Sequence, residues 1–365
     1  MSTNIETMFA LTLNECADAI EATGSRVTTL IQGHMGCGKS SILKMLAHRL
    51  PTHIPCYFDC TTKDLGDLML PKILTDNDAE FVRFAPNEEM GLHHGRPVIL
   101  MIDEFGKANA SVKNGMMRVM LERKLGNLSL HPDSLVFATT NLGSEGVGDL
   151  LLPHHRNRIT KLRIKKPTGM EWIEDFAINA GVHPSIIRWV HEFGDTLFQS
   201  FEDVANPDDN PYIYHPKAQR PAFVTPRSLE LGSYWLHAKD KLTATTVKQA
   251  LMGTIGARGG ADLEAYVAIY DQLPKRADIM ADPMTAMVPT SASATMMLVT
   301  NALIGMDAQF ITPWVKYMNR LDKEAQGYFT LQVRNPNYGK KSVVMTNAEY
   351  TKWCMENNYL FAGDI

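Results

Sequence analysis

A glycine-rich stretch near the N-terminus has the spacing of a phosphate-binding loop. Gly33, Gly38, Lys39 and Ser40 satisfy the pattern GxxxxGK[S/T], in which glycines let the backbone wrap closely around phosphate oxygens. The lysine of this pattern neutralises the β- and γ-phosphates, and the hydroxyl that follows it ligates Mg²⁺. The expected nucleotide-binding residues are Gly33, His34, Met35, Gly36, Cys37, Gly38, Lys39, Ser40 and Ser41.

An acidic pair further along the chain supplies the other half of such a site. Asp103 and Glu104 follow the apolar run Val98–Ile102, whose lack of alternation is typical of a strand buried on both faces of a parallel sheet. Ligands bind at the carboxyl ends of such strands. We therefore expect Asp103 to orient Mg²⁺, mostly through water, and Glu104 to polarise the attacking water.

The elements that must position these residues alternate along the first part of the chain. Short apolar or β-branched runs predict strands, and longer segments with helical spacing lie between them. The predicted strands are 27–31, 54–58, 98–102, 135–138 and 159–164, and the predicted helices are 5–22, 40–50 and 111–123. This alternation predicts a doubly wound α/β domain, an αβα sandwich around a parallel sheet. Residues 61–95 show no regular pattern, and residues 124–132 favour a small hairpin around Gly126 and Asn127.

After Pro167 the pattern becomes mostly helical. Residues 169–200 and 226–272 have helical spacing, and a loop rich in proline and aspartate separates them. Two further helices are predicted at 292–305 and 312–326, followed by a strand at 328–333. The expected division is an N-terminal helix (1–24), a nucleotide-binding domain (25–166), a helical domain (167–275) and a smaller, mostly helical extension of unknown role (276–365).

Composition and charge limit the classes of function. The chain has 365 residues, of which 45% are hydrophobic and 21% charged, which is typical of a soluble protein of two or three domains. The formal net charge of −4 does not indicate a dedicated nucleic-acid binder. The densest basic cluster is most simply a solvated strand edge; it consists of Lys161, Arg163, Lys165 and Lys166.

The sequence predicts a cytoplasmic protein without a membrane segment. No apolar run approaches the roughly 20 residues that span a bilayer, and the N-terminus lacks the basic and apolar regions of a signal peptide. Five cysteines, an odd number, indicate reduced thiols. Cys56 and Cys60 lack the second pair of ligands that a structural zinc site requires.

Four segments make the sequence similar to a known family. They are Gly33–Ser40, Ile102–Ala108, Phe137–Asn141 and His155–Ile159. Over roughly residues 25–235 the chain resembles the AAA+ ATPases, and within them the MoxR-like, dynein-related group. The usual central motif of that group reads Asp-Glu-Ile/Leu-Asn-Lys/Arg-Ala. Phe105 and Gly106 depart from this motif, whereas the acidic pair is intact.

The resemblance implies further site residues and an assembly. Asn141 matches the sensor-1 position, which holds the lytic water or the γ-phosphate. Arg158, with Arg156 as a close second, matches the arginine finger that reaches the ATP of a neighbouring subunit, and Arg227 resembles sensor 2. The simpler alternatives are a turn residue for Asn141, surface charges for the two arginines and a helix cap for Arg227. The resemblance also implies ATP and Mg²⁺ as cofactors, an α-helical lid domain and a homo-oligomeric, hexameric ring.

Two functions remain open at this point. The first is a ring-forming ATPase that remodels a protein partner, in a family whose members often pair with a von Willebrand A-type partner. The second is a nucleic-acid-associated motor; the acidic balance and the absence of a stripe of basic and aromatic residues favour the first. In the related group, segments equivalent to residues 62–90 and 122–133 commonly line a pore or contact substrate. A nucleotide-gated scaffold that barely hydrolyses is disfavoured by Glu104 and the arginines.

Overall fold

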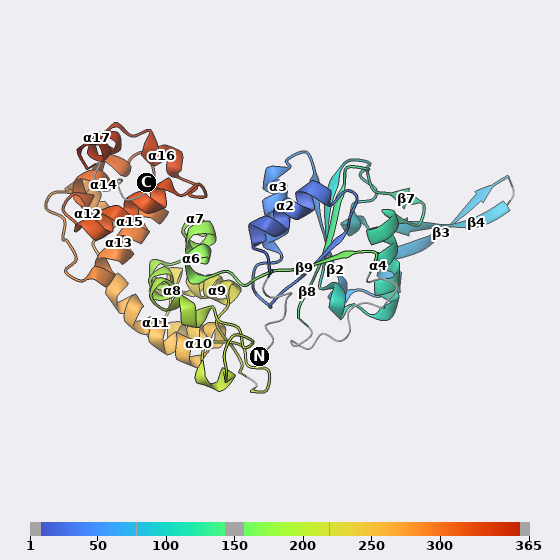
Figure 1. Cartoon of the computed structure of the whole chain (residues 1–365), viewed down its shortest axis with the longest axis horizontal. Helices are drawn as coiled ribbons and strands as arrows, with labels where there is room; N and C mark the ends of the chain where they lie inside the picture. Colours follow the sequence, from blue (N-terminus) through green and yellow to red (C-terminus); the bar gives the residue numbers. More distant parts are fainter. Residues whose placement is uncertain (1–8, 78, 143–156, 219, 358–365) are drawn as a thin grey trace. The chain divides into compact units, whose positions relative to one another are not determined.

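The structure is a computed structural model that describes residues 9–77, 79–142, 157–218 and 220–357 (Figure 1). Contacts divide the chain into two compact units, residues 1–166 and 167–365. Each unit buries its own apolar side chains, so each has a core that does not depend on the other.

The first unit is built on a five-stranded sheet in which all the paired strands are parallel, in the order β2-β5-β8-β1-β9. The strands are β1 (Thr29–Gln32), β2 (Ile54–Asp59), β5 (Val98–Asp103), β8 (Leu135–Thr140) and β9 (Thr160–Arg163). The helices are α2 (Leu13–Thr23), α3 (Ser41–Arg49) and α4 (Ala110–Glu122). The predicted α/β fold with a parallel sheet is therefore confirmed.

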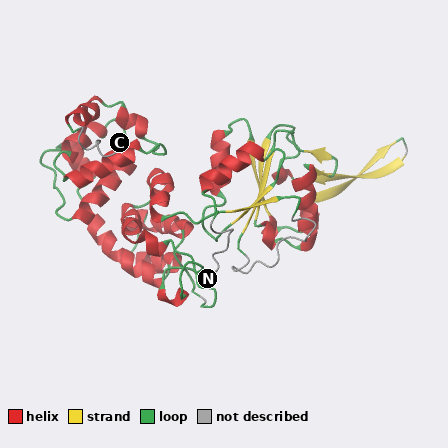
Figure 2. Ribbon diagram, in the orientation of Figure 1, coloured by secondary structure: helices red, strands yellow, loops and turns green. Residues whose placement is uncertain are grey.

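Helices cover both faces of this sheet (Figure 2). Ile99 and Met101 of β5 pack in one core with residues of α2 and α3. Leu100 and Ile102 pack in the other core, with residues of α4. Successive side chains of a strand point to opposite faces. A central strand without polar residues is therefore what a sheet covered on both sides requires.

Short elements connect the strands and helices of the first unit. Four are single 3₁₀ turns: η1 (Cys60–Thr62), η2 (Leu65–Asp67), η3 (Glu88–Met90) and η4 (Phe105–Lys107). A small hairpin consists of β6 (Lys124–Leu125) and β7 (Leu128–Ser129), and its turn contains Gly126 with φ 58°. The asparagine–glycine signal in this part of the sequence thus coincides with a real turn.

The segment without a sequence pattern contains a second antiparallel hairpin, β3 (Met69–Asp76) and β4 (Ala79–Pro86). This hairpin extends away from the sheet (Figure 1), and most of its residues are exposed. Its base is anchored by Leu68, which is fully buried. Leu68 packs so closely against α4 that a Cβ on Gly115 would lie 2.3 Å from its Cδ1 atom. The hairpin is therefore an exposed arm on a fixed base.

The second unit is helical in its described part, and none of the described helices of the chain is both long and apolar enough to cross a membrane. A single core runs from Trp172 to Trp353. The helices are α6 (Gly169–Trp172), a π-helical turn η6 (Ile173–Ala177), α7 (Ile178–Ala180), α8 (Pro184–Leu197), η7 (Pro207–Asp209), α9 (Pro226–His237), η8 (Lys239–Lys241), α10 (Ala244–Ile255), α11 (Ala257–Tyr270), α12 (Arg276–Ala281), α13 (Ala292–Ile304), α14 (Ile311–Met318), α15 (Lys323–Arg334), α16 (Lys341–Met345) and α17 (Ala348–Glu356).

The predicted strand at 328–333 is wrong, because these residues lie within α15. Aromatic and β-branched residues favoured a strand there. The side chain of Asp322 caps the helix by accepting a hydrogen bond from the backbone N–H of Ala325. Ala325, Phe329 and Val333 are each fully buried, and their four-residue spacing is that of a helix face. Packing of this face therefore overrides the local preference for a strand.

Candidate active site

The phosphate-loop pattern lies where the sequence predicted it, between β1 and α3. Gly36 and Gly38 have φ values of 70° and 97°, which favour glycine. A Cβ on Gly33 would lie 2.2 Å from Cγ2 of Ile164, so this position has no room for a side chain. The loop leads into the N-terminus of α3, whose partial positive charge favours anions. Conformation and electrostatics are both those of a phosphate cradle.

Lys39 is a buried cation whose hydrogen-bond partners are all neutral. Its Nζ atom donates to the carbonyl oxygens of Gly33 (3.0 Å) and His34 (2.8 Å) and to Oδ1 of Asn141 (2.7 Å). Only 7% of the residue is exposed, and it forms no ion pair with the described part of the chain. Burying an ammonium group without an anion is costly. The site therefore fits a ligand that brings negative charge, as phosphate does.

Asp103 ends β5 with its carboxylate held by two hydroxyl groups. The Thr139 hydroxyl donates to Oδ1, and the Tyr57 hydroxyl donates to Oδ2 over 2.8 Å. Burial and the contact with Asp103 raise the pKa of Tyr57, which keeps its phenol protonated and able to donate. Tyr57 reaches Asp103 from β2, which pairs with β5 in parallel register. The two hydroxyl groups fix the orientation of this carboxylate.

Ser40 and Asp103 are the side chains that fit Mg²⁺. Among the described residues no group of three histidine, cysteine or carboxylate side chains forms a metal cage. Mg²⁺ does not need one, because it commonly takes one or two protein oxygens and completes its shell with phosphate and water. Ser40 is the N-cap of α3, but its side chain makes no capping hydrogen bond. Its hydroxyl is thus available as a ligand.

Glu104 joins the acidic pair to the phosphate loop. Its backbone is left-handed, with φ 51°, and its N–H donates to Oγ1 of Thr139 over 3.3 Å. The Asn141 amide donates to both carboxylate oxygens of Glu104, over 3.0 and 3.3 Å. Since Asn141 also accepts from Lys39, one asparagine connects the phosphate-binding lysine with the acidic residue.

The predicted arginines lie in different parts of the chain. Arg158 is exposed in the turn before β9. Arg156 lies outside the described residues. Arg227 is exposed in the first turn of α9, which Thr225 caps, and so belongs to the second unit. The structure brings Lys39, Asp103, Glu104 and Asn141 into one network, and none of the contacts of this network involves Arg158.

Three members of the network were not predicted as site residues. Thr139 and Lys107 lie within motifs of the family resemblance, so the sequence offered a signal for them. Tyr57 had none, because its hydroxyl reaches Asp103 only through the pairing of β2 with β5. The positions of the hydroxyl and ammonium groups that contact the acidic pair therefore depend on strand register and turn geometry.

Comparison with known proteins identifies the first unit. Residues 28–149 match the model of the AAA domain of the dynein-related subfamily. No curated protein matches the sequence. Similar solved structures include the RuvB Holliday junction branch migration motor of Thermotoga maritima (17% identity, TM-score 0.35) and two of its point mutants (17% and 18% identity, TM-score 0.36 each). Each alignment covers 75% of this chain and 74% of the other. The phosphate loop, the acidic pair and the match over residues 28–149 show that the first unit carries an AAA domain of the dynein-related subfamily, an ATPase domain that uses ATP with Mg²⁺.

Proposed function

We propose that this chain is a ring-forming AAA+ ATPase that couples hydrolysis of ATP to the remodelling of a protein partner. The observation that supports remodelling is the exposed apolar hairpin β3–β4, which is attached to the same part of the unit as the acidic pair. The 3₁₀ turn η1, on the segment that leads to the hairpin, packs against η4, which directly follows Glu104. The side chain of Asn109 also donates to the carbonyl of Lys63 over 3.4 Å. A force that a bound partner exerts on the hairpin can thus be transmitted through η1 and η4 to the segment that carries Glu104.

The network gives each residue a chemical role in hydrolysis. Lys39 would leave its neutral partners to neutralise the phosphates. Ser40 and Asp103 would hold Mg²⁺, which would supply positive charge beside the phosphate oxygens. Glu104 activates water, and Asn141, once released by Lys39, orients that water or the γ-phosphate. Arg227 is proposed as sensor 2 from the resemblance of its sequence context. The hydrogen bonds that join Lys39, Asn141 and Glu104 support the roles proposed for these three residues.

Arg158 is proposed to act on the ATP of a neighbouring subunit, with Arg156 as the alternative. An exposed guanidinium in the turn before β9 is accessible to another chain. In AAA+ ATPases, which generally form rings, such an arginine completes the next site in the ring. The transition state spreads negative charge over the γ-phosphate oxygens, and a planar guanidinium matches that arrangement.

Mixed rings test the arginine in trans. Arg158→Ala subunits keep the phosphate loop, and Lys39→Ala subunits keep the arginine. An interface is therefore complete where the loop comes from an Arg158→Ala subunit and the arginine from a Lys39→Ala subunit. In an equal mixture about a quarter of the interfaces combine an intact loop with an intact arginine, so we expect roughly a quarter of the wild-type ATPase rate from two inactive proteins. The control mixes Arg158→Ala with a Lys39→Ala/Arg158→Ala double variant, which cannot repair it. A mixture no more active than its components would contradict the proposal.

The hairpin β3–β4 presents large apolar side chains to solvent on both faces. On one face Ile73 pairs with Val82 and Pro71 with Phe84, and Ile73 and Val82 are 71% and 51% exposed. The other face carries Leu70, Leu74 and Phe81. Isolated two-stranded hairpins are marginally stable, and exposed apolar patches of this kind mark interaction sites. Among the described residues no third strand covers either outer edge of the hairpin, so an extended polypeptide can add to it as a strand.

The charge of the hairpin favours protein over nucleic acid. Residues 69–86 contain two cations, Lys72 and Arg83, against three carboxylates, Asp76, Asp78 and Glu80. A net negative segment repels a phosphate backbone, whose binding depends on several cations. Lys72 lies directly opposite Arg83 in the register, an arrangement that destabilises a hairpin unless carboxylates approach it. The surface therefore fits an extended polypeptide whose apolar side chains cover the hairpin and which brings a carboxylate only to the Lys72–Arg83 pair.

A polar substitution on the apolar face tests this function. We expect an Ile73→Ser/Val82→Ser variant to keep its basal ATPase rate, because both residues are exposed and lie in the middle of β3 and β4, with no part in the polar network around Glu104. It should lose the stimulation of ATP hydrolysis that reduced, carboxymethylated α-lactalbumin, a permanently unfolded acidic protein, gives with the wild type. The measurement is the ATPase rate against probe concentration.

A neighbouring polar pair on the same face gives the control. Thr75 lies opposite Glu80, so a Thr75→Ser/Glu80→Gln variant changes this face without removing apolar surface, and it should respond like the wild type. Equal stimulation of the wild type and the Ile73→Ser/Val82→Ser variant would contradict the role of the hairpin. Stimulation by single-stranded DNA instead, lost steeply with added salt, would support the nucleic-acid motor.

A further inference from the structure

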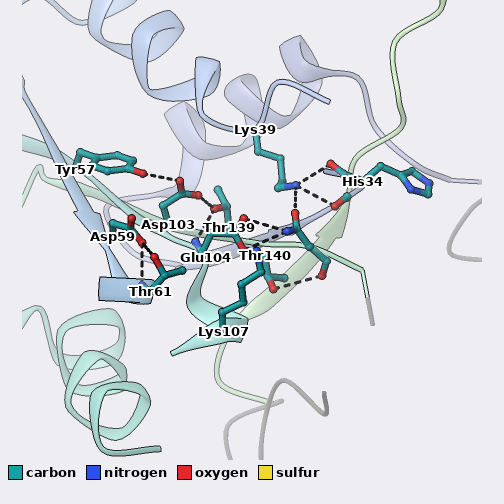
Figure 3. A network of polar contacts seen from close by, with 12 residues as sticks. His34, Lys39, Tyr57, Asp59, Thr61, Asp103, Glu104, Lys107, Thr139 and Thr140 are labelled. Atoms are coloured by element: carbon teal, nitrogen blue, oxygen red, sulfur yellow. Dashed lines mark hydrogen bonds and ion pairs between the residues drawn. The ribbon is translucent and has the colours of Figure 1, made fainter. Parts of the chain in front are cut away.

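Lys107 is a cation at the catalytic end of β5 that none of the roles above uses. Its Nζ atom lies 3.0 Å from Oε2 of Glu104, in an ion pair whose side chains are 44% and 23% exposed. Figure 3 shows Lys107 together with Glu104, Thr139 and Lys39 in one group of polar contacts. The carboxylate that is proposed to activate water therefore has a charged neighbour as well as the Asn141 amide.

The local backbone enforces this pair. Glu104, in its left-handed conformation, begins the single 3₁₀ turn η4, and the N–H of Lys107 donates to the Glu104 carbonyl over 2.8 Å. This hydrogen bond closes the turn and brings Lys107 next to Glu104, so the lysine side chain can reach the carboxylate. Phe105, fully buried, anchors the turn in the core. The turn thus holds the two residues within ion-pair distance.

Two hydrogen bonds and one ion pair hold the Glu104 side chain. The Asn141 amide reaches both oxygens, and the ammonium group of Lys107 reaches Oε2. A carboxylate that is held by these groups has fewer lone pairs free for water. Release of Asn141 on nucleotide binding removes one restraint but leaves the lysine in place.

We infer that Lys107 is a positioning residue that holds the carboxylate of Glu104 in a resting orientation and slows hydrolysis. The inference rests on the proposed role of Glu104 as the residue that activates water. Lys107 acts through Glu104, since its ammonium group forms an ion pair with that carboxylate and contacts no described residue of the phosphate loop. Its removal should therefore change the rate of the chemical step and not the affinity for ATP.

Steady-state kinetics of Lys107→Ala test the inference. We expect kcat to rise about two- to five-fold, the range that partly exposed ion pairs of this kind contribute, while KM for ATP stays unchanged. Lys107→Arg keeps a cation in reach of the carboxylate and should return kcat to the wild-type value. Arg118→Ala is the matched control, because it removes an exposed ion pair to Glu122 (3.1 Å) elsewhere on the same unit. Its kcat should not change.

A double substitution separates this inference from the role of Glu104. In a Glu104→Gln background the further change Lys107→Ala should have no effect on the remaining turnover, because the carboxylate on which the lysine acts is gone. A kcat of Lys107→Ala equal to or below the wild-type value would overturn the inference, as would a Lys107→Arg variant as fast as Lys107→Ala. Wild-type turnover in Glu104→Gln alone would instead overturn the role of Glu104.

Discussion

Glu104→Gln is expected to lower the rate of ATP hydrolysis by a factor of about 10²–10⁴ while ATP still binds, the range attributed to a positioned general base. Gln has nearly the same shape, so the hydrogen bond from Asn141 can persist through the amide oxygen. What disappears is the negative charge that draws a proton from water. Lys39 and the phosphate loop are untouched, so nucleotide affinity should stay close to that of the wild type.

Single-turnover hydrolysis and equilibrium binding of a fluorescent ATP analogue measure the two effects separately. Glu122→Gln is the matched control, because Glu122 is an exposed carboxylate of the same unit whose partner is Arg118. Equal hydrolysis rates in the Glu104→Gln protein and the wild type would contradict the proposal that Glu104 activates water. Because the variant retains ATP, an affinity pull-down with it should also hold the protein partner.

The sheet could be predicted from the sequence because strands that are buried on both faces consist almost entirely of apolar residues. A strand covered on both faces, such as Val98–Asp103, has no polar alternation and ends where the acidic side chains begin. Glycine spacing predicted the phosphate loop for a similar reason: Gly33 and Gly38 occupy positions where a side chain clashes or the backbone is left-handed. In both cases a local physical requirement admits few residue types.

The arm β3–β4 could not be predicted because its strands are exposed and therefore lack the sequence pattern of a buried or half-buried strand. Apolar residues lie on both of its faces, among them Ile73 and Phe81, so the alternation that identifies a half-buried strand is missing. The opposite error, at residues 328–333, arose because a buried helix face and a strand draw on the same aromatic and β-branched residues. Tertiary packing decides between them.

The contacts around the acidic pair were only partly predictable. The motifs pointed to Asp103, Glu104 and Asn141 as neighbours at one edge of the sheet, and the structure places them in one network. The hydroxyl of Tyr57 arrives from a different strand, and its position follows from the pairing of β2 with β5. The sequence pattern and spacing therefore predict which residues lie at the strand ends. Which hydrogen-bond donors orient those residues depends on the strand register.

Lys39→Met is expected to abolish the stabilisation that nucleotide gives to the first unit. Lys39 is buried, and its hydrogen-bond partners among the described residues are neutral, so most of the charge that phosphate would meet in the loop belongs to this residue. A ligand at about 100 times its Kd stabilises a protein by roughly 2.7 kcal/mol. For a unit of this size that corresponds to a rise in Tm of roughly 5–10 °C.

Thermal unfolding in the Glu104→Gln background, where ATP is not consumed, isolates this effect. With Lys39 present, MgATP should raise Tm, and with Lys39→Met the two curves should coincide. Lys44→Met is the control, since Lys44 is an exposed lysine on the same helix, α3, and its loss should leave the shift intact. Because Lys39 also donates to Asn141, its loss frees that amide oxygen without any nucleotide. A Lys39→Met protein that kept the full MgATP shift would show that the loop backbone and the start of α3 bind the phosphates without the lysine, and the buried cation would then need another explanation.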